Sequence, residues 1–353
     1  MESTPGMGAG MGRPIQTAPL MPEPKAKATK RAFISGVLIF IGIVVVLFVG
    51  LGLYQVYGRL STGQTTVMFA RVLRLPIAKV DGQPILFSEY AADFQAIKLV
   101  SEYDKANNGP TANLTAEQQS DQVLWRLINN RLVAASAAKY GIQLDRNQVN
   151  QIREEILKKF KTPADADKEL ATRYGWDMNT YTEKVITQYV LQNQLVDAVS
   201  NDEEWRAVVK GHAESVLAKL KAGGDFNQLA MQYSEDIDTA PNGGQLDWLT
   251  VGQGAMVPQF EVAAQALKKG EYTQELVESP YGFDIIRLDD TKTVKEKDPA
   301  TEKMVDRTQI KTAHIVFAYA NLSTYLDYMT SKSNIHVYGA AHNPFETASS
   351  TLQ

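Results

Sequence analysis

The chain of 353 residues is longer than one ordinary domain and suits about two, and its 44% of hydrophobic residues is typical of a folded protein. Its net charge is −4, and the soluble part has no basic cluster interleaved with aromatics, which argues against a nucleic-acid-binding surface. The chain contains no cysteine, which excludes a disulfide framework and a thiolate metal site.

The N-terminal region predicts a tail followed by a membrane anchor. Residues 1–31 are rich in Gly, Pro, Met and Ala without any period, so we expect a disordered cytoplasmic tail. The segment from Ala32 to Leu53 carries no charge and reaches the ~20 residues that a helix needs to cross a bilayer. We therefore expect an uncleaved transmembrane anchor over residues 32–57. A cleaved signal peptide is the alternative, but the apolar run is long for one and no A-x-A site follows it.

The charges on the two sides of this segment predict its orientation. Basic residues precede it, namely Lys25, Lys27, Lys30 and Arg31, whereas only Arg59 follows closely. By the positive-inside rule the N-terminus is then cytoplasmic. We expect a single-pass protein of the cell membrane whose later domains are extracytoplasmic.

A polar linker is expected over residues 58–72, followed by a mainly helical module over residues 73–203. The module opens with a short hairpin that turns at Asp81-Gly82. Four helical segments follow, from about residues 88, 115, 149 and 181, each with apolar residues at helical spacing. Their apolar stripes are interpreted as core, because no carboxylates or histidines cluster on them.

Two stretches of this module carry a resemblance. IAKVDGQPILFSEY and VLWRLINNRLVAASAAKYGIQLD are similar to the N-terminal chaperone module of the SurA and PrsA class of extracytoplasmic foldases. In that class a small hairpin precedes helices of this length, and a leucine-rich helix ends in lysine–aromatic–glycine. The resemblance implies that the partners are unfolded or nascent exported polypeptides.

The next segment carries several short motifs in a fixed order, namely LAKLKAGGDF, QYSED, NGGQLDW, MVPQFEVAAQAL and KKGEYTQELVESPYGFDII. Together they resemble a parvulin, the PpiC type of peptidyl-prolyl isomerase domain. The resemblance implies an α+β domain over residues 204–320, with a four-stranded antiparallel sheet flanked by helices. The residue pattern agrees, because it predicts helices over about 204–222, 225–233 and 258–267 and strands over about 274–278 and 283–289.

One strand of that fold is missing from its usual place. A parvulin begins with a strand that carries a histidine, but here the residues before the first helix, NDEEWRAVVKGHAES, read as continuous helix. The strand pattern occurs instead in QIKTAHIVFA, after the charged loop TKTVKEKDPATEKMVDR. We expect residues 309–317 to fill the vacant position beside the strand that contains Phe283, as in a circularly permuted domain.

The C-terminal segment, residues 321–340, predicts a short amphipathic helix and then a strand over Asn334–Tyr338. In the SurA and PrsA class this segment rejoins the N-terminal module, so we expect the strand to return to the hairpin. Residues 341–353 are expected to be a tail.

The parvulin resemblance implies a site without nucleophile, cofactor or metal, because no bond breaks when an X-Pro peptide bond rotates. The pocket for the proline ring would be Leu246, Met256 and Phe260. The polar set would be His314, Asp236, Ser279 and Asp284. No pair of the histidines has metal-ligand spacing, and His212 is interpreted as a solvated or capping residue at a helix start.

Asp284 stands where parvulins usually carry a second histidine. An aspartate facing His314 could accept its N–H and favour the protonated ring. Two interpretations therefore stay open: a membrane-anchored peptidyl-prolyl isomerase and folding chaperone, or a non-catalytic holdase with a degenerate parvulin domain.

Overall fold

The computed structural model describes residues 26–297 and 302–345, so most of the predicted tails over residues 1–31 and 341–353 lies outside it. The bound at residue 31 was wrong, because a helix already begins at Ala26. The chain divides into two compact units, Met1–Tyr54 and Gln55–Gln353. The first contains helix α1 (Ala26–Leu53), which a π-helical turn, η1 (Tyr54–Gly58), extends. Among the described residues, Phe33–Gly58 is the one helix long and apolar enough to cross a membrane, a property that signal sequences share.

The second unit opens with the predicted hairpin. Strands β1 (Pro76–Val80) and β2 (Gln83–Leu86) pair antiparallel across a turn at Asp81 and Gly82, which both have positive φ. Strand β7 (Ile335–Val337) pairs with the other edge of β1, which gives the order β2-β1-β7. The return of the C-terminal segment to the hairpin is thereby confirmed.

The predicted polar linker contains a helix, α2 (Gln64–Val72), and this part of the prediction was wrong. The later helices of the module are α3 (Phe87–Asn107), α4 (Ala116–Lys139), α5 (Arg146–Leu157), α6 (Pro163–Tyr174), α7 (Met178–Tyr181) and α8 (Thr187–Val199), with a π-helical turn η2 (Thr182–Ile186) between the last two. Helix α6 was not predicted because it buries little beyond Ala166 and Leu170. Its start was nevertheless encoded, since Thr162 and Asp165 form a capping box around Pro163.

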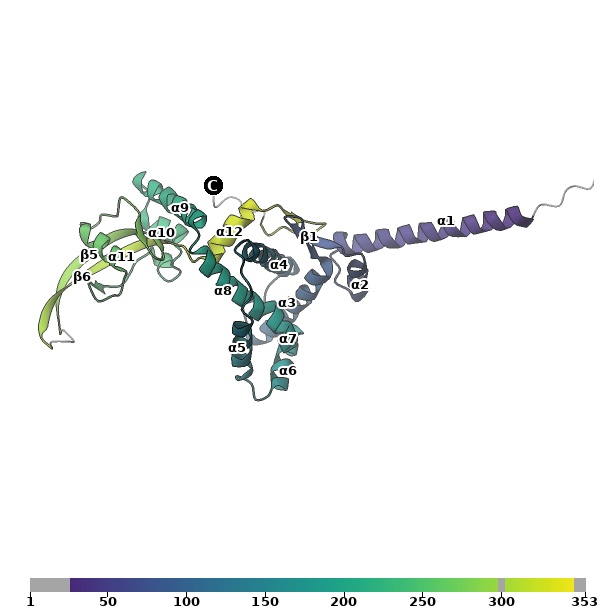
Figure 1. The fold of residues 1–353 in the computed structure, drawn as a ribbon, viewed down its shortest axis with the longest axis horizontal. Coiled ribbons are helices and arrows are strands. Elements are labelled where there is room, and N and C mark those ends of the chain that lie inside the picture. The colour runs from purple at the N-terminus through teal and green to yellow at the C-terminus, as the bar shows by residue number, and fades with distance from the viewer. Residues whose placement is uncertain (1–25, 298–301, 346–353) are drawn as a thin grey trace, which may run out of the picture. The chain divides into compact units, whose positions relative to one another are not determined.

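A four-stranded antiparallel sheet follows, with the order β3-β6-β5-β4. Its strands are β3 (Leu249–Thr250), β4 (Val277–Ser279), β5 (Gly282–Lys297) and β6 (Met304–Ala318). The displaced strand is confirmed, because β6 pairs with β5 and places His314 opposite Ile286. The charged segment between them is not a loop: β5 and β6 run side by side out to Lys297 and Met304 (Figure 1). Thr291, Thr293 and Val294 explain this extension, since β-branched residues favour strands.

The two faces of this sheet carry different helices. Helices α9 (Glu203–Lys221) and α10 (Phe226–Tyr233) join the core cluster that contains Phe283, Ile285 and Ile315. Helix α11 (Pro258–Ala266) joins a separate cluster with Ile286, Leu288 and Ile310. Neighbouring residues of one strand thus serve opposite faces, as the period of two in a strand requires.

Helix α12 (Leu322–Lys332) connects the sheet to the helical module. The buried Trp205 of α9 donates its indole N–H to the Tyr319 carbonyl at 2.8 Å, and its ring lies edge-on to Tyr325 of α12. Helix α12 also contacts α4. The chain therefore leaves the module through α8, builds the sheet, and returns through α12.

Candidate functional site

The histidine of β6 lies between two carboxylates. His314 Nδ1 is 3.0 Å from Asp284 Oδ1, and His314 Nε2 is 2.9 Å from Asp236 Oδ2. Only 5% of His314 is exposed. The expected approach of His314 to Asp284 or Asp236 is thus present with both residues at once, and we call these three side chains the Asp–His–Asp cluster.

Strand geometry brings two members of the cluster together. His314 is opposite Ile286 and Asp284 is opposite Val316, so the two residues are diagonal neighbours on the same face. Asp236 follows α10 in the loop that leads to a 3₁₀ turn, η3 (Ala240–Asn242). The Glu235 N–H donates to the Val316 carbonyl at 2.9 Å, which fixes this loop on β6.

Gly244 lets the next loop approach His314 closely. The His314 N–H donates to the Gly244 carbonyl at 2.8 Å, and Gly244 has a φ of +75°. A Cβ at this position would collide with the His314 carbonyl oxygen. The NGGQLDW motif therefore carries a glycine where the backbone of the site needs one.

The cluster perturbs the protonation of its members. Burial opposes the charged imidazole, but the hydrogen bonds and negative charges of Asp284 and Asp236 outweigh it and raise the pKa of His314 above its ordinary value. Burial would also raise the pKa of Asp236, but hydrogen bonds from Thr239 and His314 lower it below its ordinary value. Both directions favour a positive ring between negative carboxylates.

Thr239 is a site residue that the sequence reasoning missed. Its hydroxyl donates to Asp236 Oδ2 at 2.6 Å and lies 3.3 Å from His314 Nε2. The Asp238 N–H donates to the other oxygen of Asp236. An aspartate that caps its own turn, followed three residues on by threonine, was the available signal in SEDIDT.

An apolar wall lies beside the cluster. Phe260 is fully buried, and its ring meets the His314 imidazole edge-on at 5.8 Å between centroids. Leu246 and Met256 are half-buried and pack on the same apolar group. The three expected pocket residues thus lie in one apolar cluster, in which Phe260 is buried and the other two are partly exposed.

Two further sequence expectations fare differently. Ser279 is the last residue of β4, where its hydroxyl donates to the Gly282 carbonyl and accepts from the Tyr281 N–H rather than bonding to the cluster. The interpretation of His212 was wrong, because this residue lies in the middle of α9 and is half-buried against Phe317 and Tyr233. Burial lowers the pKa of His212. Within residues 26–297 and 302–345, no group of His, Asp and Glu side chains could hold a metal ion.

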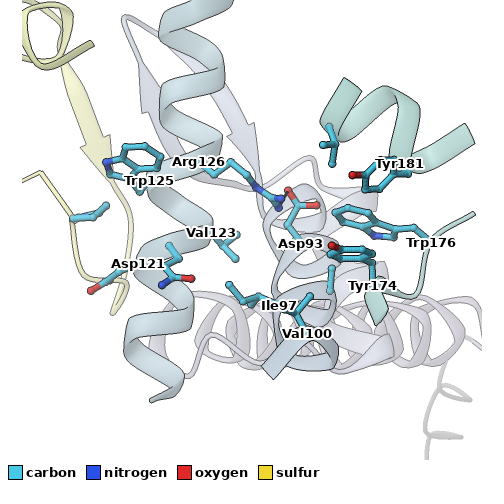
Figure 2. Close-up of a pocket in the computed structure, with 14 residues that line it drawn as sticks. Asp93, Ile97, Val100, Asp121, Val123, Trp125, Arg126, Tyr174, Trp176 and Tyr181 are labelled. Carbon is cyan, nitrogen blue, oxygen red and sulfur yellow. Dashed lines mark ion pairs between the residues drawn. The ribbon is translucent and has the colours of Figure 1, made fainter. Parts of the chain in front are cut away.

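A second candidate site lies among the helices of the N-terminal module. It is a cavity of about 550 Å³ whose walls come from α3, α4 and the α6–α7 region. Figure 2 shows Ile97, Val100 and Val123 facing the aromatic rings of Tyr174, Trp176 and Tyr181 across it. The sequence reasoning treated Tyr181 as core, and it missed the cavity because its walls are distant in sequence.

A buried ionic group holds the walls of this cavity together. Asp93 is 2% exposed and accepts from Arg126 and Lys184, each at 2.8 Å. Both cations also lie about 6 Å from the centre of the Trp176 ring, at 6.0 Å and 5.8 Å. The lining is thus mainly apolar and aromatic, with its one buried carboxylate already paired.

Comparison with known proteins matches two stretches of the chain to family models. Residues 28–193 match the model of a SurA-like N-terminal domain, and residues 180–292 match that of a PPIC-type PPIase domain. The foldase protein PrsA of Geobacillus kaustophilus is 29% identical over 270 residues, which is 76% of this chain and 79% of the relative. A parvulin-like PPIase of Rickettsia typhi is 31% identical over 183 residues, 50% of this chain and 61% of the relative. The chaperone SurA of Alkalilimnicola ehrlichii is 35% identical over 109 residues, 31% of this chain and 23% of the relative.

The chain contains a SurA-like N-terminal domain and a PPIC-type PPIase domain, and it is similar to PrsA foldases. The matched range of the isomerase domain ends at residue 292, before β6 begins at Met304. The strand that supplies His314 to the isomerase domain thus lies outside the stretch that the family model recognises. The aromatic cavity lies almost wholly within the SurA-like range, apart from Pro344.

Proposed function

We propose that this foldase is a membrane-anchored, extracytoplasmic peptidyl-prolyl isomerase and chaperone for exported proteins. The observation that carries the proposal is the Asp–His–Asp cluster beside the half-open wall of Leu246 and Met256. An X-Pro bond rotates over a barrier of ~20 kcal/mol without any bond breaking. A pocket for the ring and a fixed charge beside the amide are therefore sufficient chemistry.

The charge of the cluster suits this rotation. A planar amide carries negative charge on its oxygen, and twisting removes conjugation and reduces that charge. With His314 protonated, the cluster keeps a net charge of −1, counting one imidazolium and two carboxylates. A negative group facing the carbonyl oxygen destabilises the planar state more than the twisted one and so lowers the barrier. In this mechanism Asp236 faces the substrate, while His314 and Thr239 position it.

Asp284 has a defined place in this proposal. Because two carboxylates lie at the nitrogens of His314, they favour the charged ring and fix its orientation without a second histidine. Ser279 would act through the β4–β5 turn that leads into Asp284. The Leu246 and Met256 side chains would contact the proline ring above Phe260.

The aromatic cavity of Figure 2 supports the chaperone part of the proposal. Its apolar and aromatic lining suits side chains that an unfolded polypeptide exposes. A purely non-catalytic holdase is the second candidate, and this cavity is the observation that favours it. Both functions predict binding of unfolded chains, but only the isomerase predicts a faster X-Pro step.

Refolding of a client whose rate is limited by proline isomerisation separates the two candidates. The full chain in detergent should accelerate the slow refolding phase of this client, which proline isomerisation limits. Met256→Ala should reduce this acceleration, whereas Val262→Ala, at an exposed position of the same α11 region, should not. Trp176→Ala should weaken suppression of client aggregation while the rate on a short X-Pro peptide stays unchanged. Aggregation suppression without any effect on the slow phase would favour the holdase.

The proposed location rests on the apolar helix α1 and its basic N-terminal flank. Because the chain has no cysteine, single cysteines report its topology. In intact cells an impermeant thiol reagent should label Val262→Cys and not Lys27→Cys. If the mature protein starts near residue 58, the apolar segment is a cleaved signal peptide and not an anchor.

A further inference from the structure

Helix α2 exposes an apolar face directly after the proposed anchor. Met68 and Val72 are 68% and 72% exposed, and Leu73, which follows the helix, is 46% exposed. Met68 and Val72 are four residues apart, so they lie on the same side of the helix. Large apolar side chains gathered at one exposed place indicate a contact surface.

The opposite side of α2 is already used by the fold. Thr66 and Ala70 are buried, and α2 contacts α3. A groove of about 550 Å³ between these helices runs beside Met68 and Arg71. Met68 thus borders this groove, and Met68 and Val72 stay exposed, so neither side chain is buried by packing inside the second unit.

The charges of the sequence stretch that carries this face have one sign. From Pro24 to Val80 the sequence contains no aspartate or glutamate. After the apolar segment the same stretch contributes Arg59, Arg71, Arg74 and Lys79. Arg71 and Arg74 are exposed and flank Val72 and Leu73. Apolar side chains bordered by cations match the boundary between the acyl chains and anionic headgroups of a bilayer.

The length of the chain keeps α2 near the end of the membrane span. Only residues 59–63 separate Gly58, where the apolar helix ends, from Gln64. At about 3.5 Å per residue these cannot reach beyond roughly 20 Å. A surface held this close to a bilayer has a high effective concentration, so a small apolar face suffices for binding.

We propose that α2 is an interfacial helix that docks the foldase on the anionic surface of the bilayer that α1 crosses. Met68 and Val72 enter between the lipid headgroups, and Arg71 and Arg74 bind lipid phosphates. The inference rests on the proposed membrane anchor. Since α2 packs on α3, whose residues Ile97 and Val100 line the aromatic cavity, docking also sets the direction in which that cavity faces.

Spin labels on single cysteines in the full chain test this proposal, because the natural chain has no cysteine to remove. The protein is reconstituted into vesicles that contain anionic phosphatidylglycerol, and each label is compared for access to oxygen and to a water-soluble nickel complex. Labels at Leu47, Met68, Val72 and Val262 report the anchor, the two α2 positions and a solvent-exposed control. Labels at positions 68 and 72 should be shielded from nickel, and the label at position 262 should not.

Separate variants test whether Arg71 and Arg74 bind anionic lipid. Arg71→Gln and Arg74→Gln together should reduce the docked-to-free ratio of the Met68→Cys protein by about 25-fold, at about fivefold for each basic residue near an anionic surface. Vesicles of neutral phosphatidylcholine should have a similar effect. The proposal is overturned if the label at 68 is as open to nickel as that at 262 while the label at 47 is shielded. If the label at 47 is itself open to nickel, the anchor fails and the interfacial helix fails with it.

Discussion

A protonated imidazole is the form of His314 that can donate to both of its neighbours. Neutral imidazole has one N–H, so one of Asp236 and Asp284 would then face a ring lone pair at about 3 Å. Asp236 also accepts a hydrogen bond from the Thr239 hydroxyl at 2.6 Å, whereas His314 is the side chain that can donate to Asp284. The raised pKa of His314 and the lowered pKa of Asp236 follow from this arrangement.

We expect the His314 ring to titrate above 6.5, its ordinary pKa, in an NMR titration of its ring nitrogens. Asp284→Asn keeps the size of the side chain but removes a negative charge, so it should lower the pKa of His314. Thr66→Ser, far from the cluster in α2, should leave this pKa unchanged. A wild-type ring that titrates below 6.5 would contradict the charged cluster.

The same pKa shifts predict how stability depends on pH. Because the pKa of His314 is raised by folding, its contribution is complete below about pH 6.5 and is lost as pH rises through the folded value. Because the pKa of Asp236 is lowered, its contribution is present above about pH 4 and is lost as pH falls through the folded value. His314→Gln should therefore reduce the free energy of unfolding by about 1–3 kcal/mol near pH 6, and by less near pH 9, in urea titrations. An equal or larger loss at pH 9 would contradict this assignment.

At the scale of elements, the site depends on two loops that approach β6. One is held by the Glu235 backbone, and the other passes Gly244 against the His314 carbonyl. The approach of Gly244 is tight because its carbonyl accepts the His314 N–H and its φ is positive. A side chain at this point would separate the loop from the strand.

Gly244→Ala should therefore destabilise the chain far more than Gly254→Ala. Both glycines have positive φ, at +75° and +73°, but a Cβ at Gly254 meets nothing within 4 Å. The control should cost about 1–2 kcal/mol for the backbone conformation alone. Gly244→Ala should add about 1–3 kcal/mol from the collision, measured by urea unfolding. Equal losses for the two variants would show that the close approach does not matter.

The sequence predicted these elements where the signal was local. QIKTAHIVFA alternates apolar and polar side chains, and this pattern predicted strand β6. The parvulin resemblance left one strand position vacant beside the Phe283 strand, and this predicted that β6 pairs with β5. The stretch after Asp290 was wrongly predicted to be a loop. Its many lysines and glutamates are typical of loops, although its β-branched residues are spaced as in a strand. Thr239 and the aromatic cavity escaped because they depend on side chains that only the folded chain brings together, such as Asp93 with Lys184.

At the scale of the whole molecule, the C-terminal part of the chain adds one strand to each of the two sheets. Strand β6 completes the sheet, and β7 then completes the hairpin next to β1. The Tyr338 N–H donates to the Ile77 carbonyl at 2.9 Å, and Asn334 donates to Asp81 at 2.7 Å. Phe345 is also buried in the main core cluster. The C-terminal segment therefore stabilises the hairpin near the start of the second unit.

Removal of residues 334–353 should lower Tm by about 5–10 °C, since it uncovers the edge of β1 and removes Phe345 from the core. Removal of residues 346–353 alone is the matched control, and it should leave Tm nearly unchanged. Thermal unfolding of the two truncated proteins, each with its N-terminal helix and in detergent, measures the difference in Tm. A Tm that is the same for both truncations would mean that β7 contributes nothing.

The central claim is that β6 completes an active isomerase site in which Asp236 faces the substrate. The most direct test is the rate of cis-to-trans isomerisation of a short X-Pro peptide with the full chain in detergent. The account predicts clear acceleration by the natural protein and by Val262→Ala. It predicts a rate at least about tenfold lower for folded Asp236→Asn, which corresponds to about 1.4 kcal/mol of barrier. A natural, folded protein whose rate equals that of buffer would contradict the claim.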